Sequence, residues 1–356
     1  MNHYFRNAGR VVFIVVFWTW LIVHARVHAQ QIQSAETQQT AEAKQQQSDS
    51  QQQVTTLRMT WTDTSRQREI PVTIRFVETT QTPMPVIIFS HGLGGSRDHY
   101  EYLSLHWAKA GYMVVHPQHL GSDDAVWRQS QGQVRQSLTQ AMINPANRLN
   151  RPRDVKFVIS EIIRLNGDEQ SPLYGKADAD RIGMAGHSFG AYTTLAVGGM
   201  AATLPGGRRV SLMDSRVKAL LPMSAPADSR QRGLVTMFEP IALPCLHMTG
   251  TNDQSIIGQT TAADRRMPFD QMHRADNYLL ILKDGDHMVF SQARQLGRDV
   301  WRDAIHVKMI LDASTAFWNA YLKADEEALQ WLQDEQGFKK QLGKEGTFEV
   351  KKKTSE

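Results

Sequence analysis

The sequence predicts an α/β fold in which an eight-stranded, mostly parallel sheet is flanked by helices. Short, mostly apolar runs recur along the chain, and turn residues follow most of them closely. Stretches with helical periodicity separate several of these runs. Strands that alternate with helices require right-handed crossovers, which produce a mainly parallel sheet. A composition of 41% hydrophobic and 21% charged residues in 356 suits a globular protein that buries a substantial core.

Eight segments are expected to be strands. The first two, Leu57–Thr62 and Glu69–Val77, carry β-branched and aromatic residues and are typical of an antiparallel hairpin. The other six are short and mostly apolar: Val86–Ser90, Tyr112–His116, Arg181–Ala185, Val217–Met223, Cys245–Thr249 and Tyr278–Leu282.

Helical periodicity is clear in two places. Apolar residues recur with helical spacing from Val155 to Ile162, after Arg151-Pro152-Arg153, and a final helix of the domain is expected from about Trp301 to Leu322. Beyond Lys323 the sequence predicts an amphipathic piece, Glu326–Leu332. A solvated polar end that closes with the basic run Lys351-Lys352-Lys353 is expected to follow.

The first 29 residues are expected to be a signal peptide. Arg6 and Arg10 give a positive start, an apolar run from Val11 to Val23 follows, and small residues precede a cleavage site after Ala29. An uncleaved anchor is the weaker alternative, because a spanning helix needs about 20 apolar residues. The protein is therefore expected to be exported, to the periplasm or the medium, with no stable membrane span after cleavage.

Charge and cysteine content restrict the partners and the chemistry. The signal holds three arginines and no acidic residue, so its removal lowers the formal net charge from +4 to +1. That small charge gives no reason to expect nucleic acid as a partner. Cys245 is the only cysteine, which excludes an intramolecular disulfide, and its apolar surroundings predict a buried core residue.

Four regions follow from these patterns. After the signal peptide, residues 30–53 are dominated by Gln with Ser, Thr, Ala and Glu, which predicts a disordered spacer. Residues 54–324 form the expected catalytic domain, and residues 325–356 the C-terminal helical piece and basic tail.

A nucleophile motif follows the fifth expected strand. Gly186-His187-Ser188-Phe189-Gly190 fills the pattern G-x-S-x-G, and a helix-compatible stretch comes after it. The serine of this motif sits in a sharp strand-to-helix turn, where side chains at the flanking positions would clash. The context indicates that Ser188 is a nucleophile. An idle serine in a glycine-rich turn is the alternative.

A serine nucleophile needs a base and an acid, which strand-and-helix proteins with this motif supply in the order Ser, acid, His. His287 follows the last expected strand and is the candidate base. Asp253, in Gly250-Thr251-Asn252-Asp253, follows the preceding strand and is the preferred acid. Asp228 keeps the same order and competes with it. His116 and His119 form a weaker metal-site alternative, because no third ligand accompanies them.

Two backbone donors are expected to stabilise a tetrahedral oxyanion. One is the N–H of Phe189. The other is the N–H of Leu93, in the glycine-rich loop His91-Gly92-Leu93-Gly94-Gly95, where glycine lets the backbone approach a substrate. A plain glycine-rich turn is the alternative. The segment Gly121–Asn150, which contains Trp127, is either a wall of the substrate site or a surface insertion.

These two loop motifs resemble those of α/β hydrolases grouped around platelet-activating factor acetylhydrolases and dienelactone-hydrolase-like proteins, over about residues 54–322. The resemblance implies the α/β-hydrolase fold and short acyl esters as substrates, and more remotely the polyesters that cutinase-like enzymes cleave. Two departures stand out. Platelet-activating factor acetylhydrolases take their acid after the sixth strand, where this chain has Met223-Ser224-Ala225-Pro226, and dienelactone hydrolases use cysteine in place of Ser188.

The sequence therefore predicts an exported serine carboxylic-ester hydrolase that acts through an acyl-enzyme on small-molecule or lipid-like esters. Ser188, His287 and Asp253 are its expected triad, and no metal or organic cofactor is required. An exported serine peptidase of the same fold is the first alternative, although the chain has no room for the propeller that such enzymes usually carry. A non-catalytic binding protein is the second.

Overall fold

The computed structural model describes residues 53–78, 83–203, 209–227, 235–291 and 300–353. The chain divides into two units, Met1–Gln53 and Val54–Glu356, and the described residues belong almost entirely to the second. The expected signal peptide and all but the last residue of the expected spacer lie outside the described residues, and so does Asp228.

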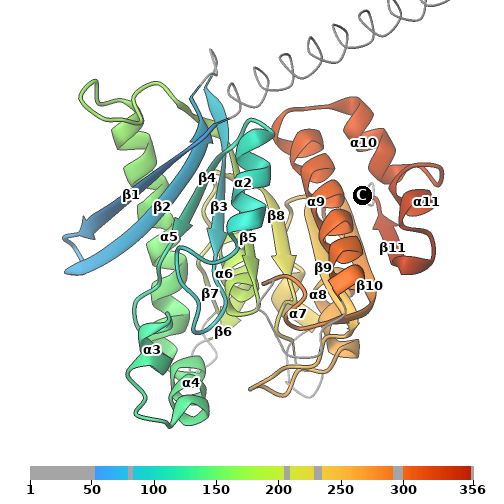
Figure 1. Cartoon of the computed structure of the whole chain (residues 1–356), viewed down its shortest axis with the longest axis horizontal. Helices are drawn as coiled ribbons and strands as arrows, with labels where there is room; N and C mark the ends of the chain where they lie inside the picture. The colour runs from blue at the N-terminus through green and yellow to red at the C-terminus, as the bar shows by residue number, and fades with distance from the viewer. Residues whose placement is uncertain (1–52, 79–82, 204–208, 228–234, 292–299, 354–356) are drawn as a thin grey trace, which may run out of the picture. The chain divides into compact units, whose positions relative to one another are not determined.

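A nine-stranded sheet forms the centre of the second unit (Figure 1). Its order is β1-β2-β4-β3-β5-β8-β9-β10-β11. Pairing is parallel from β4 to β10, whereas β1, β2 and β11 pair antiparallel. The predicted mostly parallel α/β sheet is thus confirmed. The strands are β1 (Val54–Asp63), β2 (Arg68–Val77), β3 (Met84–Ser90), β4 (Met113–Pro117), β5 (Ala177–His187), β8 (Val217–Met223), β9 (Cys245–Asn252), β10 (Asn277–Asp286) and β11 (Gly346–Lys351); β6 (Ala201–Thr203) and β7 (Arg209–Ser211) form a separate pair.

The predicted count of eight sheet strands is wrong by one. Each of the eight predicted segments corresponds to a strand, with Tyr112 alone falling outside, just before β4. β11 adds a ninth strand from the segment expected to be a solvated tail. β11 pairs antiparallel with β10, and its Phe348 is buried against the rings of Tyr278 and Phe338. One aromatic side chain among charged neighbours gives little sequence signal, so the strand depends on the edge that β10 offers.

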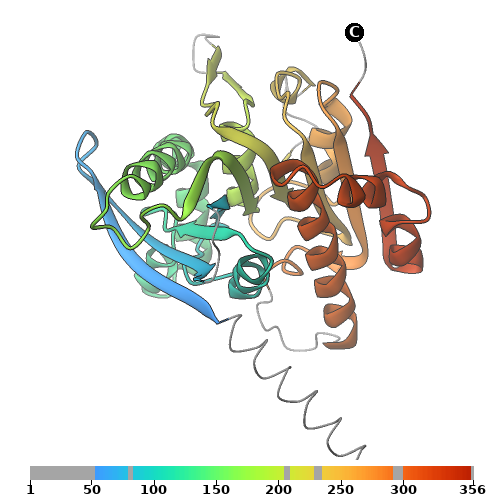
Figure 2. The same cartoon turned by 90° about the horizontal axis from the view of Figure 1, so that it is seen from above.

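Helices cover both faces of the sheet (Figure 2). α5 (Pro145–Asn166) and α6 (Phe189–Val197) pack on one face, and α2 (Glu101–Lys109) and α9 (Val300–Leu322) pack on the other, each pair over its own apolar cluster. Alternate residues of β3 belong to opposite clusters, as the period of a strand requires. The other helices are α3 (Ala125–Arg128), α4 (Val134–Ile143), α7 (Val235–Phe238), α8 (Met267–Gln271), α10 (Glu326–Gln333) and α11 (Phe338–Leu342), with 3₁₀ turns at Ala263–Arg266 and Gly343–Glu345.

α5 begins earlier than the apolar periodicity indicated. The side chain of Asn144 accepts a hydrogen bond from the N–H of Ala146, and Pro145 occupies the first turn, where its missing N–H costs nothing. Arg151 and Pro152 consequently lie inside the helix, on a buried turn. This extension brings the Arg151 guanidinium into the protein interior.

Cys245 lies at the start of β9 with no exposed surface, so the predicted core position is confirmed. Burial raises the pKa of its thiol well above the usual value, which keeps it protonated and unreactive. Among the residues described above, no helix is long and apolar enough to cross a membrane.

Five buried histidines are held neutral by their surroundings. Burial lowers the pKa of His116 and His247 to about 3 and that of His119 to about 4. Burial also lowers the pKa of His91 and His187 well below the usual 6.5. Between pH 6.5 and about 4, the unfolded chain therefore binds more protons than the folded protein does.

We therefore expect the free energy of unfolding to fall as the pH drops from 6.5 towards 4. Each such histidine contributes about 1.4 kcal/mol per pH unit within this window. Urea unfolding at several pH values measures the slope, and His116→Phe, which removes one titrating ring that stacks on Phe89, is expected to reduce it by that amount. A stability that rises towards pH 4 would contradict the assignment.

Candidate active site

Ser188 lies in a strained turn between β5 and α6. Its φ of 56° and ψ of −113° are unusual for a non-glycine residue, and its N–H donates to the carbonyl of Met223 at 2.9 Å. A Cβ on Gly186 would lie 2.5 Å from the carbonyl oxygen of Gly190, and one on Gly190 would overlap the carbonyl oxygen of Ser90. The two glycines therefore let α6 start directly against β5 and β3.

Gly190→Ala is expected to destabilise the protein by about 3 kcal/mol or more, because backbone rather than a flexible side chain blocks the new methyl group. Gly167→Ala is the matched control. Its Cβ would lie 3.7 Å from the carbonyl oxygen of Arg164, and we expect a change within about 0.5 kcal/mol. Urea unfolding compares the two variants, and equal stabilities would contradict the close approach.

The structure brings Ser188, His287 and Asp253 together at the carboxyl ends of β5, β9 and β10. His287 Nε2 lies 3.0 Å from Ser188 Oγ, and His287 Nδ1 lies 2.7 Å from Asp253 Oδ1. A carboxylate only accepts hydrogen bonds, so Nδ1 carries the proton and Nε2 is free to accept from the serine hydroxyl. This is the tautomer that a general base requires.

Asp253 is held as a carboxylate. Burial alone would raise its pKa, but the hydrogen bond from His287 and the positive charge of Arg265 outweigh burial and lower the pKa below its usual range. Its second oxygen accepts from Ser224 Oγ at 2.5 Å and from Thr249 Oγ1 at 2.8 Å. Four neighbours thus fix the position of a side chain that has no exposed surface.

Arg265 is a site residue that the sequence reasoning missed. It lies in the 3₁₀ turn at Ala263–Arg266, and its Nε is 3.1 Å from Asp253 Oδ1. Its Nη1 donates to the carbonyls of Ser224 and Ala225 at 2.9 and 3.1 Å, so the guanidinium ties the loops after β8 and β9 together. An arginine in an ordinary charged stretch gives no sequence signal for such a role.

His187 has a supporting role that the sequence did not predict. Its Nε2 lies 2.9 Å from the carbonyl oxygen of His287, so Nε2 donates, and Nδ1 accepts from the Tyr100 hydroxyl at 2.8 Å. The rings of His187 and His287 are 4.8 Å apart. His187 therefore supports the backbone of His287.

The loop after β3 lies against the turn that carries Ser188. A Cβ on Gly92 would be 3.5 Å from the carbonyl oxygen of His187. The carbonyl of Gly92 accepts from His91 Nδ1 at 2.7 Å and from the N–H of Gly95 at 3.0 Å. Within the described part of the chain, the N–H groups of Leu93 and Phe189 donate no intramolecular hydrogen bond, so both are available to a substrate oxygen.

The segment Gly121–Asn150 contributes a surface beside this loop. Trp127 Nε1 donates to the carbonyl of Gly94 at 2.8 Å, and a Cβ on Gly94 would lie 3.0 Å from Leu138 and 3.1 Å from Trp127. Trp127 remains 38% exposed. α3 and α4 thus place apolar side chains next to Gly94.

The fold and this site define an α/β hydrolase. The family model of PET hydrolase-like proteins, PETase, matches residues 90–335, which is more than half of the chain and includes every residue of the site. The chain belongs to this family, and it is an ester hydrolase in the general sense that the family shares. No individual curated protein matches it.

Proposed function

We propose that the protein is a serine carboxylic-ester hydrolase that works through an acyl-enzyme. Ser188 Oγ attacks the ester carbonyl carbon while His287 Nε2 takes its proton, and the same nitrogen returns that proton to the departing alcohol. Water then attacks the acyl-enzyme by the same route and releases the acid. Asp253 orients His287 and stabilises the imidazolium that forms.

One observation carries this proposal, namely the continuous hydrogen-bonded series Ser188–His287–Asp253 beside two backbone donors. The distances of 3.0 and 2.7 Å lie within hydrogen-bonding range. The N–H of Phe189 directly follows the serine in sequence, and the N–H of Leu93 belongs to the loop that lies against the serine's turn. Two such donors suit the negative charge that develops on the carbonyl oxygen. The catalytic step needs no metal or organic cofactor.

The proposed substrates are short acyl esters or lipid-like esters. The partly exposed indole of Trp127 and the neighbouring Leu138 offer an apolar surface beside Gly94, which suits an acyl chain or an aromatic ring. The family name adds poly(ethylene terephthalate) as a further ester whose aromatic acyl group such a surface suits.

The test combines a covalent probe with a substrate panel. A fluorophosphonate probe is expected to modify Ser188, as peptide mapping by mass spectrometry would show. The panel contains p-nitrophenyl acetate, butyrate and octanoate, together with bis(2-hydroxyethyl) terephthalate as a soluble fragment of the aromatic polymer. The proposal expects turnover of at least one ester and an adduct at Ser188. An adduct at another residue would overturn the nucleophile assignment.

Two rival functions are separated by the same assay. A serine peptidase would cleave p-nitroanilide amides of the same acyl groups at rates comparable to the esters, whereas an esterase is expected to leave them nearly untouched. A binding protein would turn over neither class. The triad geometry favours catalysis over binding, because the three side chains are aligned for proton transfer from Ser188 to His287, which binding alone does not need.

Export is the second part of the proposal. It rests on the positive start, apolar run and small residues of positions 1–29. N-terminal sequencing of protein recovered from the periplasm or the medium is expected to begin at Gln30. A full-length protein that stays in the membrane fraction would favour the uncleaved anchor.

A further inference from the structure

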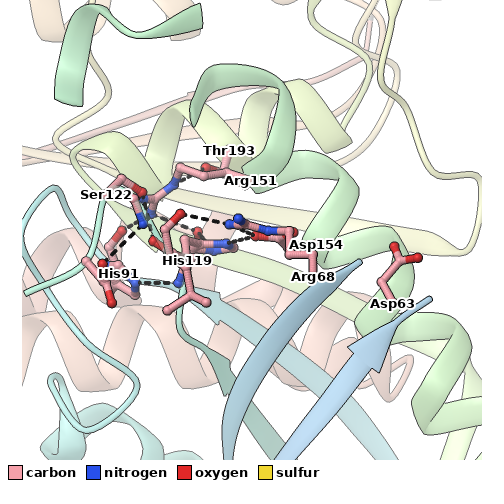
Figure 3. A network of polar contacts seen from close by, with 12 residues as sticks. Asp63, Arg68, His91, His119, Ser122, Arg151, Asp154 and Thr193 are labelled. Atoms are coloured by element: carbon pink, nitrogen blue, oxygen red, sulfur yellow. Dashed lines mark hydrogen bonds and ion pairs between the residues drawn. The ribbon is translucent and has the colours of Figure 1, made fainter. Parts of the chain in front are cut away.

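A buried arginine on α5 lies against the loop after β3, the loop that carries Leu93. Arg151 has no exposed surface, and Figure 3 shows its guanidinium among polar groups from other parts of the chain, among them His91, Ser122 and Thr193. It donates to the carbonyl of His91, to Ser90 Oγ at 3.2 Å, to Ser122 Oγ at 2.9 Å and to Thr193 Oγ1 at 3.1 Å. Two of these contacts, His91 and Thr193, lead to the two free backbone donors.

The first contact leads to Leu93. Arg151 holds the carbonyl of His91, and the His91 side chain in turn donates from Nδ1 to the carbonyl of Gly92. The carbonyl of Gly92 and the N–H of Leu93 belong to the same planar peptide group, so fixing one fixes the direction of the other. His91 Nε2 also accepts from the N–H of His119 at 3.0 Å, which locks its ring.

The second contact leads to Phe189. Thr193 Oγ1, which accepts from Arg151, donates to the carbonyl of Phe189 at 3.0 Å in the first turn of α6. The guanidinium carbon also lies 4.6 Å from the centre of the Phe189 ring. One side chain thus contacts both the loop that carries the first donor and the helix that carries the second.

The charge of Arg151 is not neutralised by a direct ion pair. Asp154, one turn further along α5, is bound instead by Arg66, Arg68 and His119, and no ion pair among the described residues includes Arg151. Burial lowers the pKa of Arg151 to about 9, so the group remains a cation at neutral pH. Fully buried charges are usually paired, and an unpaired cation here favours negative charge nearby.

We propose that Arg151 is a positioning residue of the oxyanion hole, which holds the N–H groups of Leu93 and Phe189 at a fixed separation through His91 and Thr193. The inference rests on the proposed function, since it assigns the support of the same site. Arg151 touches no reacting atom. Its effect should therefore appear in the transition state, where the oxyanion forms, and much less in the binding of the ground-state ester.

Arg151→Met is expected to lower kcat for p-nitrophenyl butyrate by about 10²-fold with little change in KM, because a displacement of about 1 Å at the donors costs that much. Arg151→Lys, which keeps the charge and loses the fork, should recover part of that loss. Binding of butaneboronic acid, whose serine adduct is a tetrahedral anion, should weaken in parallel with kcat. Thr193→Val, which removes one contact, should lower kcat by about tenfold and remains informative if Arg151→Met does not fold.

The matched control is Arg75→Met. Arg75 is also buried, but its guanidinium contacts Ser104 and Glu101, which belong to neither donor segment. We expect a lower melting temperature with kcat and boronate affinity unchanged. A folded Arg151→Lys or Thr193→Val with the kcat and boronate affinity of the wild type would overturn the positioning role. A wild-type protein without ester turnover would instead overturn the proposed function, and the inference with it.

Discussion

Ser188→Ala is expected to lower kcat for p-nitrophenyl butyrate by about 10⁶-fold, and His287→Ala by a similar amount. Each variant removes one member of a pair that acts as a unit, since the hydroxyl is a poor nucleophile until Nε2, 3.0 Å away, accepts its proton. The double variant should therefore be no less active than either single variant. Single-turnover and steady-state kinetics on the folded proteins measure the three rates.

Ser160→Ala is the matched control for the nucleophile. Ser160 lies on α5, and its hydroxyl donates to the carbonyl of Lys156 and accepts from Arg216, away from the site. Its removal should leave kcat unchanged. If the loss of kcat in the double variant equalled the product of the two single losses, the two side chains would act independently. That result would contradict a proton transfer from Ser188 to His287.

Much of the fold could be predicted because its signals are local. The parallel strands are short runs of mostly apolar residues, without the spacing of an amphipathic helix. Glycine is needed at positions 186 and 190 because backbone atoms occupy the place where a Cβ would lie. Chain order then indicated His287 and Asp253, because successive parallel strands end at the same edge of the sheet. The structure brings these two side chains to Ser188, while their catalytic roles stay predictions.

The supporting residues could not be predicted because their partners are distant in sequence. Arg265 contacts loops after two other strands, and Arg151 contacts residues 42 and 60 positions away. Each resembles an ordinary surface arginine until the fold buries it. Ser224 lies in the segment after the sixth predicted strand, Met223-Ser224-Ala225-Pro226, and it donates a hydrogen bond to Asp253, the acid predicted after the next strand.

Asp253→Asn is expected to lower kcat by about 10⁴-fold, less than the loss of the base itself. The amide nitrogen would face Nδ1 of His287, so the ring would turn to the tautomer with the proton on Nε2 and could no longer accept from Ser188. The same change leaves Arg265 without its carboxylate. Breaking such a buried pair costs about 3–5 kcal/mol, so kcat must be measured well below the melting temperature of the variant.

Asp228 also keeps the order Ser, acid, His, so it is the competing candidate for the acid. The variant Asp228→Ala tests it against Asp253. With Asp253 at 2.7 Å from Nδ1 and fixed by Ser224, Thr249 and Arg265, Asp228→Ala is expected to retain wild-type turnover. Together, Asp228→Ala and Asp253→Asn test whether the acid orients the His287 ring. An acid that only added negative charge could be replaced by any nearby carboxylate. An inactive Asp228→Ala together with an active Asp253→Asn would reverse the assignment, and the four contacts on Asp253 would then be structural.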